Sequence, residues 1–125
     1  MTNIRWLVLA AMTAAGAVSP ALAKEGDSTR GKMLYESRCV ACHSLDANRV
    51  GPAHQGVFGR KAGSALGYDY STAVKASTLV WTEVTLDRWL ADPESTIPGQ
   101  KMGYSVSLPA DRADLIAYLK QASGK

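Results

Sequence analysis

The sequence has only two cysteines, two histidines and one phenylalanine among its 125 residues. A framework of several disulfides is excluded, because two cysteines form at most one bridge. A tetrahedral zinc site made of cysteine and histidine would need all four of these residues. With a single phenylalanine the polypeptide core would be thin, and a large apolar cofactor would solve that packing problem.

Excess charge of either sign is also absent. Lysine and arginine number 14 against 11 acidic residues, a formal net charge of +3. This balance does not suit nucleic acid, which is recognised by basic clusters on one face. It is compatible with weak docking onto an acidic protein surface, because a local patch steers association more than the total charge does. No repeat, low-complexity segment or internal linker divides the chain, so we expect one domain.

The first residues have the pattern of an export signal. Arg5 is followed by an apolar stretch without charges, residues 6–18, which is too short to span a bilayer, and then by the small-residue sequence P-A-L-A ending at Ala23. We predict a signal peptide over residues 1–23 and a mature domain over residues 24–125, with net charge +2 once Arg5 is removed. The alternatives are a buried amino-terminal helix or an uncleaved anchor. The prediction places the mature chain in the periplasm, an oxidising compartment, as a monomer without stable membrane insertion.

The mature segment is predicted to be all-α, because it has no run of alternating β-branched residues. We expect helices over residues 30 to about 40, 71–77, 83–91 and from 109 or 110 to 122. Ser28 or Thr29 would cap the first helix, Ser71 the second and Thr82 the third. Asp92-Pro93 would end the third helix. Glycine-rich text over residues 48–70 and the stretch 94–109 predict irregular loops. Loops this long in a small domain are expected to wrap around something.

Both cysteines and one histidine lie in the pentapeptide Cys39-Val40-Ala41-Cys42-His43. C-x-x-C-H is the attachment signature of c-type haem. Two thiols about one helical turn apart can form thioethers with the two vinyl groups of the porphyrin. The adjacent imidazole of His43 then becomes the proximal ligand of the iron.

Three other interpretations of the pentapeptide are possible. A thioredoxin-type dithiol needs a helix amino terminus to lower the thiol pKa, whereas this pair follows the end of a predicted helix. Zinc would require Cys39, Cys42, His43 and His54 together, although adjacent residues are poorly placed to share one tetrahedral ion. A disulfide between Cys39 and Cys42 would close a loop too small to stabilise much.

An ordered set of motifs beyond the pentapeptide resembles the class I cytochromes c, specifically the mitochondrial-like and bacterial c2-like branch. The matching text is G-K-x-x-Y before C-V-A-C-H, then G-P-A-H-Q-G-V-F-G-R-K-A-G, G-Y-D-Y-S, W, W-L-A-D-P, I-P-G-Q-K-M-G-Y and D-L-I-A-Y-L, in family order from Gly31 to Ala122. The resemblance implies a fold of few helices and long loops around one covalently bound haem. It also implies a one-electron carrier and not an enzyme.

The resemblance further implies the residues that surround the haem. Met102 in P-G-Q-K-M would be the sixth ligand, and a thioether favours Fe(II) and raises the reduction potential. The carbonyl of Pro52 would accept the Nδ1 proton of the proximal His43. Donors to the buried inner propionate would be Arg60, Tyr70 and Trp81. Gly31 and Tyr35 would pack against Leu115, Tyr118 and Leu119 where the terminal helices cross.

The chain departs from the family pattern at several positions near the haem. Val74, Trp89 and Gln100 stand where an asparagine, a tyrosine and a threonine are common near the methionine ligand. A drier distal side should raise the reduction potential, and Gln100 could supply one hydrogen bond to the sulfur. His54 stands where leucine is common, and we expect a loop or surface histidine there.

Exchange of electrons is expected at an exposed haem edge with a thin basic collar. Its candidate members are Arg38, Arg49, Lys61, Lys75 and Lys101. Redox partners would dock transiently, the donor being a quinol-oxidising complex or dehydrogenase and the acceptor an oxidase, reaction centre or peroxidase. The alternative function is a haem enzyme, or a sensor of gas or peroxide, in which Met102 is displaced.

Overall fold

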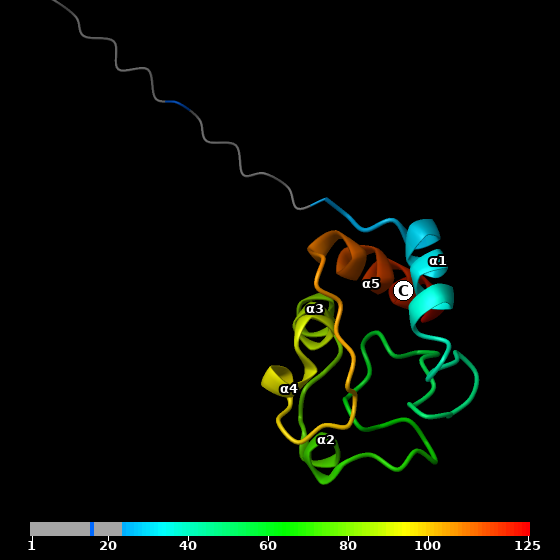
Figure 1. Ribbon diagram of the computed structural model, residues 1–125, viewed down its shortest axis with the longest axis vertical. Coiled ribbons are helices and arrows are strands. Elements are labelled where there is room, and N and C mark those ends of the chain that lie inside the picture. The colour runs from blue at the N-terminus through cyan, green and yellow to red at the C-terminus, as the bar shows by residue number, and fades with distance from the viewer. Residues whose placement is uncertain (1–15, 17–23) are drawn as a thin grey trace, which may run out of the picture.

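The computed structural model describes residue 16 and residues 24–125, and five helices lie in the latter segment (Figure 1). They are α1 (Ser28–Arg38), α2 (Thr72–Ala76), α3 (Glu83–Ala91), α4 (Pro93–Thr96) and α5 (Pro109–Ala122). The described residues contain no strand beyond one isolated antiparallel bridge between Lys61 and Val80. The all-α expectation is therefore confirmed. The predicted signal peptide, apart from Gly16, lies outside the described residues and stays a prediction.

The start of α1 differs from the sequence-based expectation. Asp27 is the cap, and its carboxylate accepts hydrogen bonds from the backbone N–H groups of Thr29 (2.9 Å) and Arg30 (3.1 Å). The prediction that Ser28 or Thr29 caps the helix was wrong, because the carboxylate of Asp27 satisfies two amides that would otherwise lack partners. The helix ends at Arg38, so Cys39 directly follows its last residue.

The predicted caps of the middle helices are present, but a short helix was missed. Ser71 caps α2, and Thr82 exchanges side-chain hydrogen bonds with Thr85 at the start of α3. Asp92 ends α3 as expected, yet its carboxylate also accepts from the backbone N–H of Ser95 at 3.0 Å and caps α4. Proline is well suited to a first helical turn, so Pro93 stops one helix and starts the next.

The two terminal helices, α1 and α5, lie side by side (Figure 1) and form the most extensive helix contact of the described residues. A Cβ atom on Gly31 would lie 1.9 Å from the backbone oxygen of Asp114, so only glycine permits this approach. Tyr35, one turn later, is 3% exposed, and its ring centroid lies 5.2 Å from that of Tyr118. The expected packing between the terminal helices is therefore present.

Ion pairs reinforce the same contact. Arg30 on α1 bonds the carboxylates of both Asp111 and Asp114, and Arg38 reaches Asp111 at 3.0 Å. Asp114 also accepts a hydrogen bond from the backbone N–H of Asp27 at 2.7 Å. The hydrogen bond from Arg30 is the main reason why the pKa of Asp111 is lowered. The side chain of Asp111 is only 2% exposed, so its charge depends on these partners.

The segment between α4 and α5 is fastened to both α3 and α5. The backbone N–H of Val106 donates to Leu90 at 2.7 Å, and Val106 is almost fully buried. Arg112 of α5 donates to the carbonyls of Val106 and Ser107 and pairs with Asp87 of α3 at 2.7 Å. Together these contacts fix the path of residues 97–108 across the molecule. No helix among the described residues is long and apolar enough to cross a membrane.

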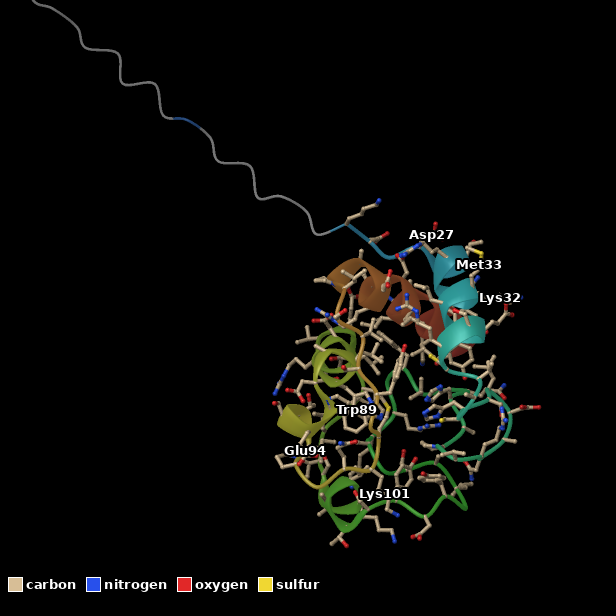
Figure 2. The ribbon with its side chains drawn as sticks, in the orientation of Figure 1. Asp27, Lys32, Met33, Trp89, Glu94 and Lys101 are labelled. Atoms are coloured by element: carbon tan, nitrogen blue, oxygen red, sulfur yellow. The ribbon has the colours of Figure 1, made fainter. Side chains whose placement is uncertain are left out.

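Replacing Gly31 with alanine should destabilise the protein by about 1–3 kcal/mol, because the new methyl group would push α1 away from α5. Denaturant unfolding monitored by far-ultraviolet circular dichroism measures this loss. Lys32→Ala, on the outer side of the same helix in Figure 2, is the control and should change the free energy of unfolding by less than about 0.5 kcal/mol. If both substitutions changed the free energy of unfolding equally, the close approach of α1 to α5 at Gly31 would be contradicted.

The Asp111 carboxylate should make the stability of the folded protein depend on pH in the acidic range. Its pKa is lower in the folded state than the ordinary value of about 3.9, so its stabilisation is present above that value and is lost as pH falls through the folded-state pKa. Asp111→Asn should therefore lower the thermal midpoint at pH 7, and the difference from the wild type should shrink below about pH 4. The exposed Asp46→Asn serves as the control and should show no such convergence.

Candidate functional site: a cavity between two walls of the fold

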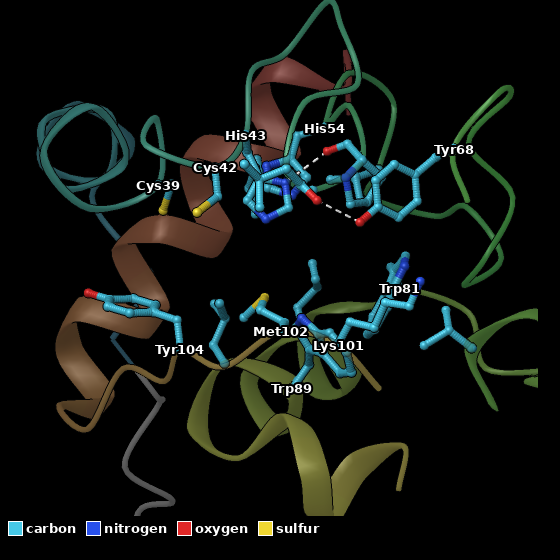
Figure 3. A pocket seen from close by; sticks show the side chains of 18 of the residues that line it. Cys39, Cys42, His43, His54, Tyr68, Trp81, Trp89, Lys101, Met102 and Tyr104 are labelled. Carbon is cyan, nitrogen blue, oxygen red and sulfur yellow. Dashed lines mark hydrogen bonds between the residues drawn. The ribbon is translucent and has the colours of Figure 1, made fainter. Parts of the chain in front are cut away.

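A cavity of about 750 Å³, lined mainly by apolar atoms, occupies the space between the loops and α3, and it is shown in Figure 3. All eight residues predicted from the sequence to hold a haem line this one cavity: Cys39, Cys42, His43, Pro52, Arg60, Tyr70, Trp81 and Met102. Residues that are up to 63 positions apart in the sequence, Cys39 and Met102, are thus brought together. A cavity of this size and polarity suits a large, mostly apolar ligand.

The pentapeptide begins directly after α1 and continues in turns. The backbone N–H groups of Cys42 (3.1 Å) and His43 (2.9 Å) both donate to the carbonyl of Cys39. Gly51 then donates to the carbonyl of Cys42 at 2.8 Å, which ties the following loop to this segment. In Figure 3 both sulfur atoms lie on the same side of the cavity, next to His43. The arrangement presents two thiols and an imidazole to one ligand.

The other interpretations of the pentapeptide fit this geometry poorly. Burial raises the pKa of the Cys39 thiol to about 11, whereas a redox-active dithiol needs a lowered pKa. Both cysteines are free, so no disulfide joins Cys39 to Cys42. Among residues 24–125, no three histidine, cysteine or acidic side chains gather closely enough to share a metal ion. Within the described residues the two thiols therefore neither form a disulfide nor share a metal ion with other side chains.

His43 is held with one ring nitrogen toward the cavity. Its Nδ1 lies 2.8 Å from the carbonyl oxygen of Pro52, a group that can only accept, so Nδ1 carries the proton and Nε2 keeps a lone pair. Burial lowers the pKa of His43 and favours the neutral ring that a metal requires. A Cβ atom on Gly51 would lie 2.1 Å from Cε1 of His43, so glycine is needed there for the ring to fit.

Met102 lies across the cavity from His43 (Figure 3), and a brace of polar groups holds its backbone. The backbone N–H of Met102 donates to the side-chain oxygen of Gln100, whose side-chain nitrogen donates to Glu94 at 3.1 Å. Glu94 also accepts from the backbone N–H of Gly99 at 2.9 Å. Gln100 was expected as a possible hydrogen-bond donor to the Met102 sulfur. In the structure the side-chain nitrogen donates a hydrogen bond to Glu94, and the bond to the sulfur stays a prediction.

Val74 and Trp89 add apolar surface to the cavity that Met102 lines, as their side chains predict. Val74 is buried, and Trp89 packs against Trp81 with ring centroids 5.2 Å apart. Both line the cavity. A side of the cavity with few polar groups stabilises the less highly charged form of a bound metal.

One corner of the cavity fits an acidic group. Arg60 donates from its terminal nitrogens to the carbonyls of Ala53 (2.9 Å) and Gln55 (3.1 Å), while its buried Nε has no partner. The Tyr70 hydroxyl accepts from the backbone N–H of Ala65 and still has its own proton to donate. A buried donor without a partner is costly, and a carboxylate would satisfy it. The cavity thus fits a flat apolar group that carries propionates.

His54 belongs to a loop, as expected, but its main contact was not predicted. Its ring stacks on that of His43 with centroids 3.9 Å apart. Its Nδ1 lies 3.0 Å from the hydroxyl of Tyr35. Burial lowers the pKa of His54 to about 3, so its ring is neutral at ordinary pH. The stacked pair could not be found from spacing because it joins separate segments, and the bonds of Glu94 to Gly99 and Gln100, although local, follow no motif in the sequence.

The family model described as Cytochrome c matches residues 28–123 of this chain. The chain belongs to the class I cytochrome c family. Cytochrome c type-1 of Ascaris suum is 44% identical over 104 residues, covering 81% of this chain and 93% of that protein. Cytochrome c of Arabidopsis thaliana is 42% identical over 101 residues, covering 78% and 90%.

A solved structure extends the comparison to the fold. Cytochrome cH from Methylobacterium extorquens is 45% identical, with a TM-score of 0.73, and the match covers 77% of this chain and 99% of that one. As a class I cytochrome c, the chain carries one covalently attached haem c and works in electron transport. The fold, cofactor and broad function expected from the sequence are thereby confirmed.

The brace at Met102 should slow exchange of its amide hydrogen. Gln100→Ala removes the acceptor, and we expect the Met102 amide to exchange about 3–10 times faster, which corresponds to the loss of one hydrogen bond. The exchange rates of the amide hydrogens of residues 97–104 are measured by NMR or mass spectrometry. Ser95→Ala is the control, because Ser95 bonds Asp92 and not this brace. An unchanged Met102 rate would show that the brace does not restrain the segment.

Proposed function

We propose that this cytochrome c is a periplasmic one-electron carrier whose haem is attached through Cys39 and Cys42 and whose iron is held between His43 and Met102. The observation that carries the proposal is the placement of His43 and Met102 on opposite sides of one cavity (Figure 3). When bound, haem c supplies the one-electron Fe(II)/Fe(III) couple. The polypeptide supplies two axial ligands and an apolar enclosure.

The chemistry of the two candidate ligands supports a carrier. The hydrogen bond of His43 to Pro52 fixes the tautomer and makes Nε2 a stronger donor. The thioether of Met102 is soft and neutral, and it favours the ferrous state. With both axial positions occupied by protein and Met102 braced through Gln100, oxygen or peroxide would find no open position. The alternative, an enzyme or sensor with a displaceable Met102, has no comparable support.

Four of the five basic residues proposed for partner docking, all except Lys61, already have partners within the protein. Arg38 pairs with Asp111, and Arg49 donates to the carbonyl of Val40 at 2.5 Å. Lys75 pairs with Asp69 at 3.2 Å, and Lys101 donates to the backbone oxygen of Asp69 at 3.3 Å. Since Asp69 offsets positive charge beside the cavity, we propose weak, transient docking with modest salt dependence.

The proposed location rests on the export pattern of the sequence and on a bacterial relative. The pattern around Arg5 and Ala23 favours export, and cytochrome cH is from a bacterium, Methylobacterium extorquens. We propose that a quinol-oxidising complex or a dehydrogenase reduces the protein, and that an oxidase, reaction centre or peroxidase oxidises it. The mature chain would act without inserting into the membrane.

Met102→Ala tests the sixth ligand. We expect loss of the weak far-red absorption band of the ferric protein, which reports sulfur ligation, and a lower reduction potential, because a harder ligand or water would replace the thioether. Absorption spectra and a redox titration measure both. Met33→Ala is the control, since Met33 on α1 is 60% exposed and remote from the cavity in Figure 2.

The same spectra separate the two functions. Persistence of the far-red band in Met102→Ala would refute ligation by Met102. Rapid binding of peroxide or carbon monoxide to the wild-type protein would favour the enzyme or sensor instead. A stable six-coordinate spectrum of the wild type in the presence of either molecule is what the carrier predicts.

A further inference from the structure

We propose that His54 is a positioning residue for His43: its ring, stacked flat on the proximal imidazole and anchored by Tyr35, fixes the plane of His43 and stabilises positive charge on it. The inference rests on the proposed ligation of iron by His43. It concerns a residue outside the haem-binding motif, which covers one face of His43.

The stack has the geometry of a specific contact. The two ring centroids are 3.9 Å apart and the ring planes differ by 19°, so His54 covers one face of His43. The Pro52 carbonyl holds the edge of His43 at Nδ1. A ring fixed at an edge and on a face cannot rotate freely about its Cβ–Cγ bond. The orientation of the proximal ring is therefore set by two contacts that lie in different directions.

His54 is itself held in place by its surroundings. Its Nδ1 is bonded to the hydroxyl of Tyr35 at 3.0 Å, and the Tyr35 ring meets it edge-on at 5.7 Å. The backbone N–H of His54 donates to Ser44, the residue after His43, at 3.0 Å. Because Tyr35 is packed between α1 and α5, the contact between the terminal helices is connected through His54 to the proximal ligand.

The aromatic face gives His54 an electrostatic effect that a leucine would lack. Iron in its ferric state draws electron density from the proximal imidazole and leaves that ring more positive. The negative face of an adjacent π-system attracts such a ring. His54 should therefore favour the ferric state and lower the reduction potential.

The test compares His54→Leu with His54→Phe, which keeps an aromatic face but loses the bond to Tyr35. In His54→Leu the potential should rise, so that the ferric-to-ferrous ratio at a fixed potential falls about threefold. The g values of the ferric protein in electron paramagnetic resonance should also shift, because they report the planes of the axial ligands. His54→Phe should restore both readouts toward the wild type.

A matched control separates this effect from simple packing. Phe58→Leu removes another half-buried ring, one that lies under Lys120 and does not line the cavity. It should lower the unfolding midpoint and leave the potential and g values unchanged. Tyr35→Phe frees the ring of His54 while keeping the stacked aromatic face, so, like His54→Phe, it should shift the g values in the same direction as His54→Leu but by less; if His54→Leu does not assemble, this shift decides.

The proposal would be overturned if His54→Leu changed only the unfolding midpoint, as Phe58→Leu does, or if His54→Phe failed to restore the signals. Loss of the low-spin ferric spectrum in His54→Leu would also overturn it, because His54 would then be a ligand itself. The far-red band of the wild type is an independent check: its absence refutes ligation by Met102 and leaves the role of His54 to the g values.

Discussion

The close approach of α1 and α5 at Gly31 is the contact on which the rest of the structure depends. The glycine lets the helix backbones meet, and Arg30 then joins the buried Asp111 to Asp114 across the contact. Because α1 ends at Arg38, fixing this helix also fixes where Cys39 begins the pentapeptide. The same helix carries Tyr35 to His54. One contact made without any cofactor atom thus orients the proximal side of the cavity.

The distal side depends on a different set of interactions. Val106 and Arg112 fasten residues 97–108 to α3 and α5, and Gln100 fixes the backbone of Met102. The bonds of Gln100 are local and partly exposed, so water competes with them more readily than with the buried contacts of α1 and α5. The two walls of the cavity are therefore held with unequal strength.

The sequence predicted the helices and the pentapeptide well because both depend on local patterns. The caps at Ser71 and Thr82 and the C-x-x-C-H spacing need only neighbours along the chain. The other residues around the cavity were expected only from the family resemblance. Cap choice failed at α1, where three adjacent polar residues compete and the carboxylate of Asp27 satisfies two amides at once. The stacking of His54 on His43 was not predicted, because it arises only when separate segments meet in the fold.

The unequal strength of the two walls has a consequence for electron transfer. The proximal ring of His43 is bonded at an edge and covered on a face, whereas the Met102 side relies on a brace that ends at the exposed Glu94. If His43 and Met102 bind the iron as proposed, any rearrangement on a change of iron charge should therefore be taken up on the methionine side. A carrier works fastest when neither ligand moves, and a ligand-binding protein needs one that does. The strength of the hydrogen bonds from Gly99 and Gln100 to Glu94 thus distinguishes an electron carrier from a ligand-binding protein more sharply than the identity of the ligands does.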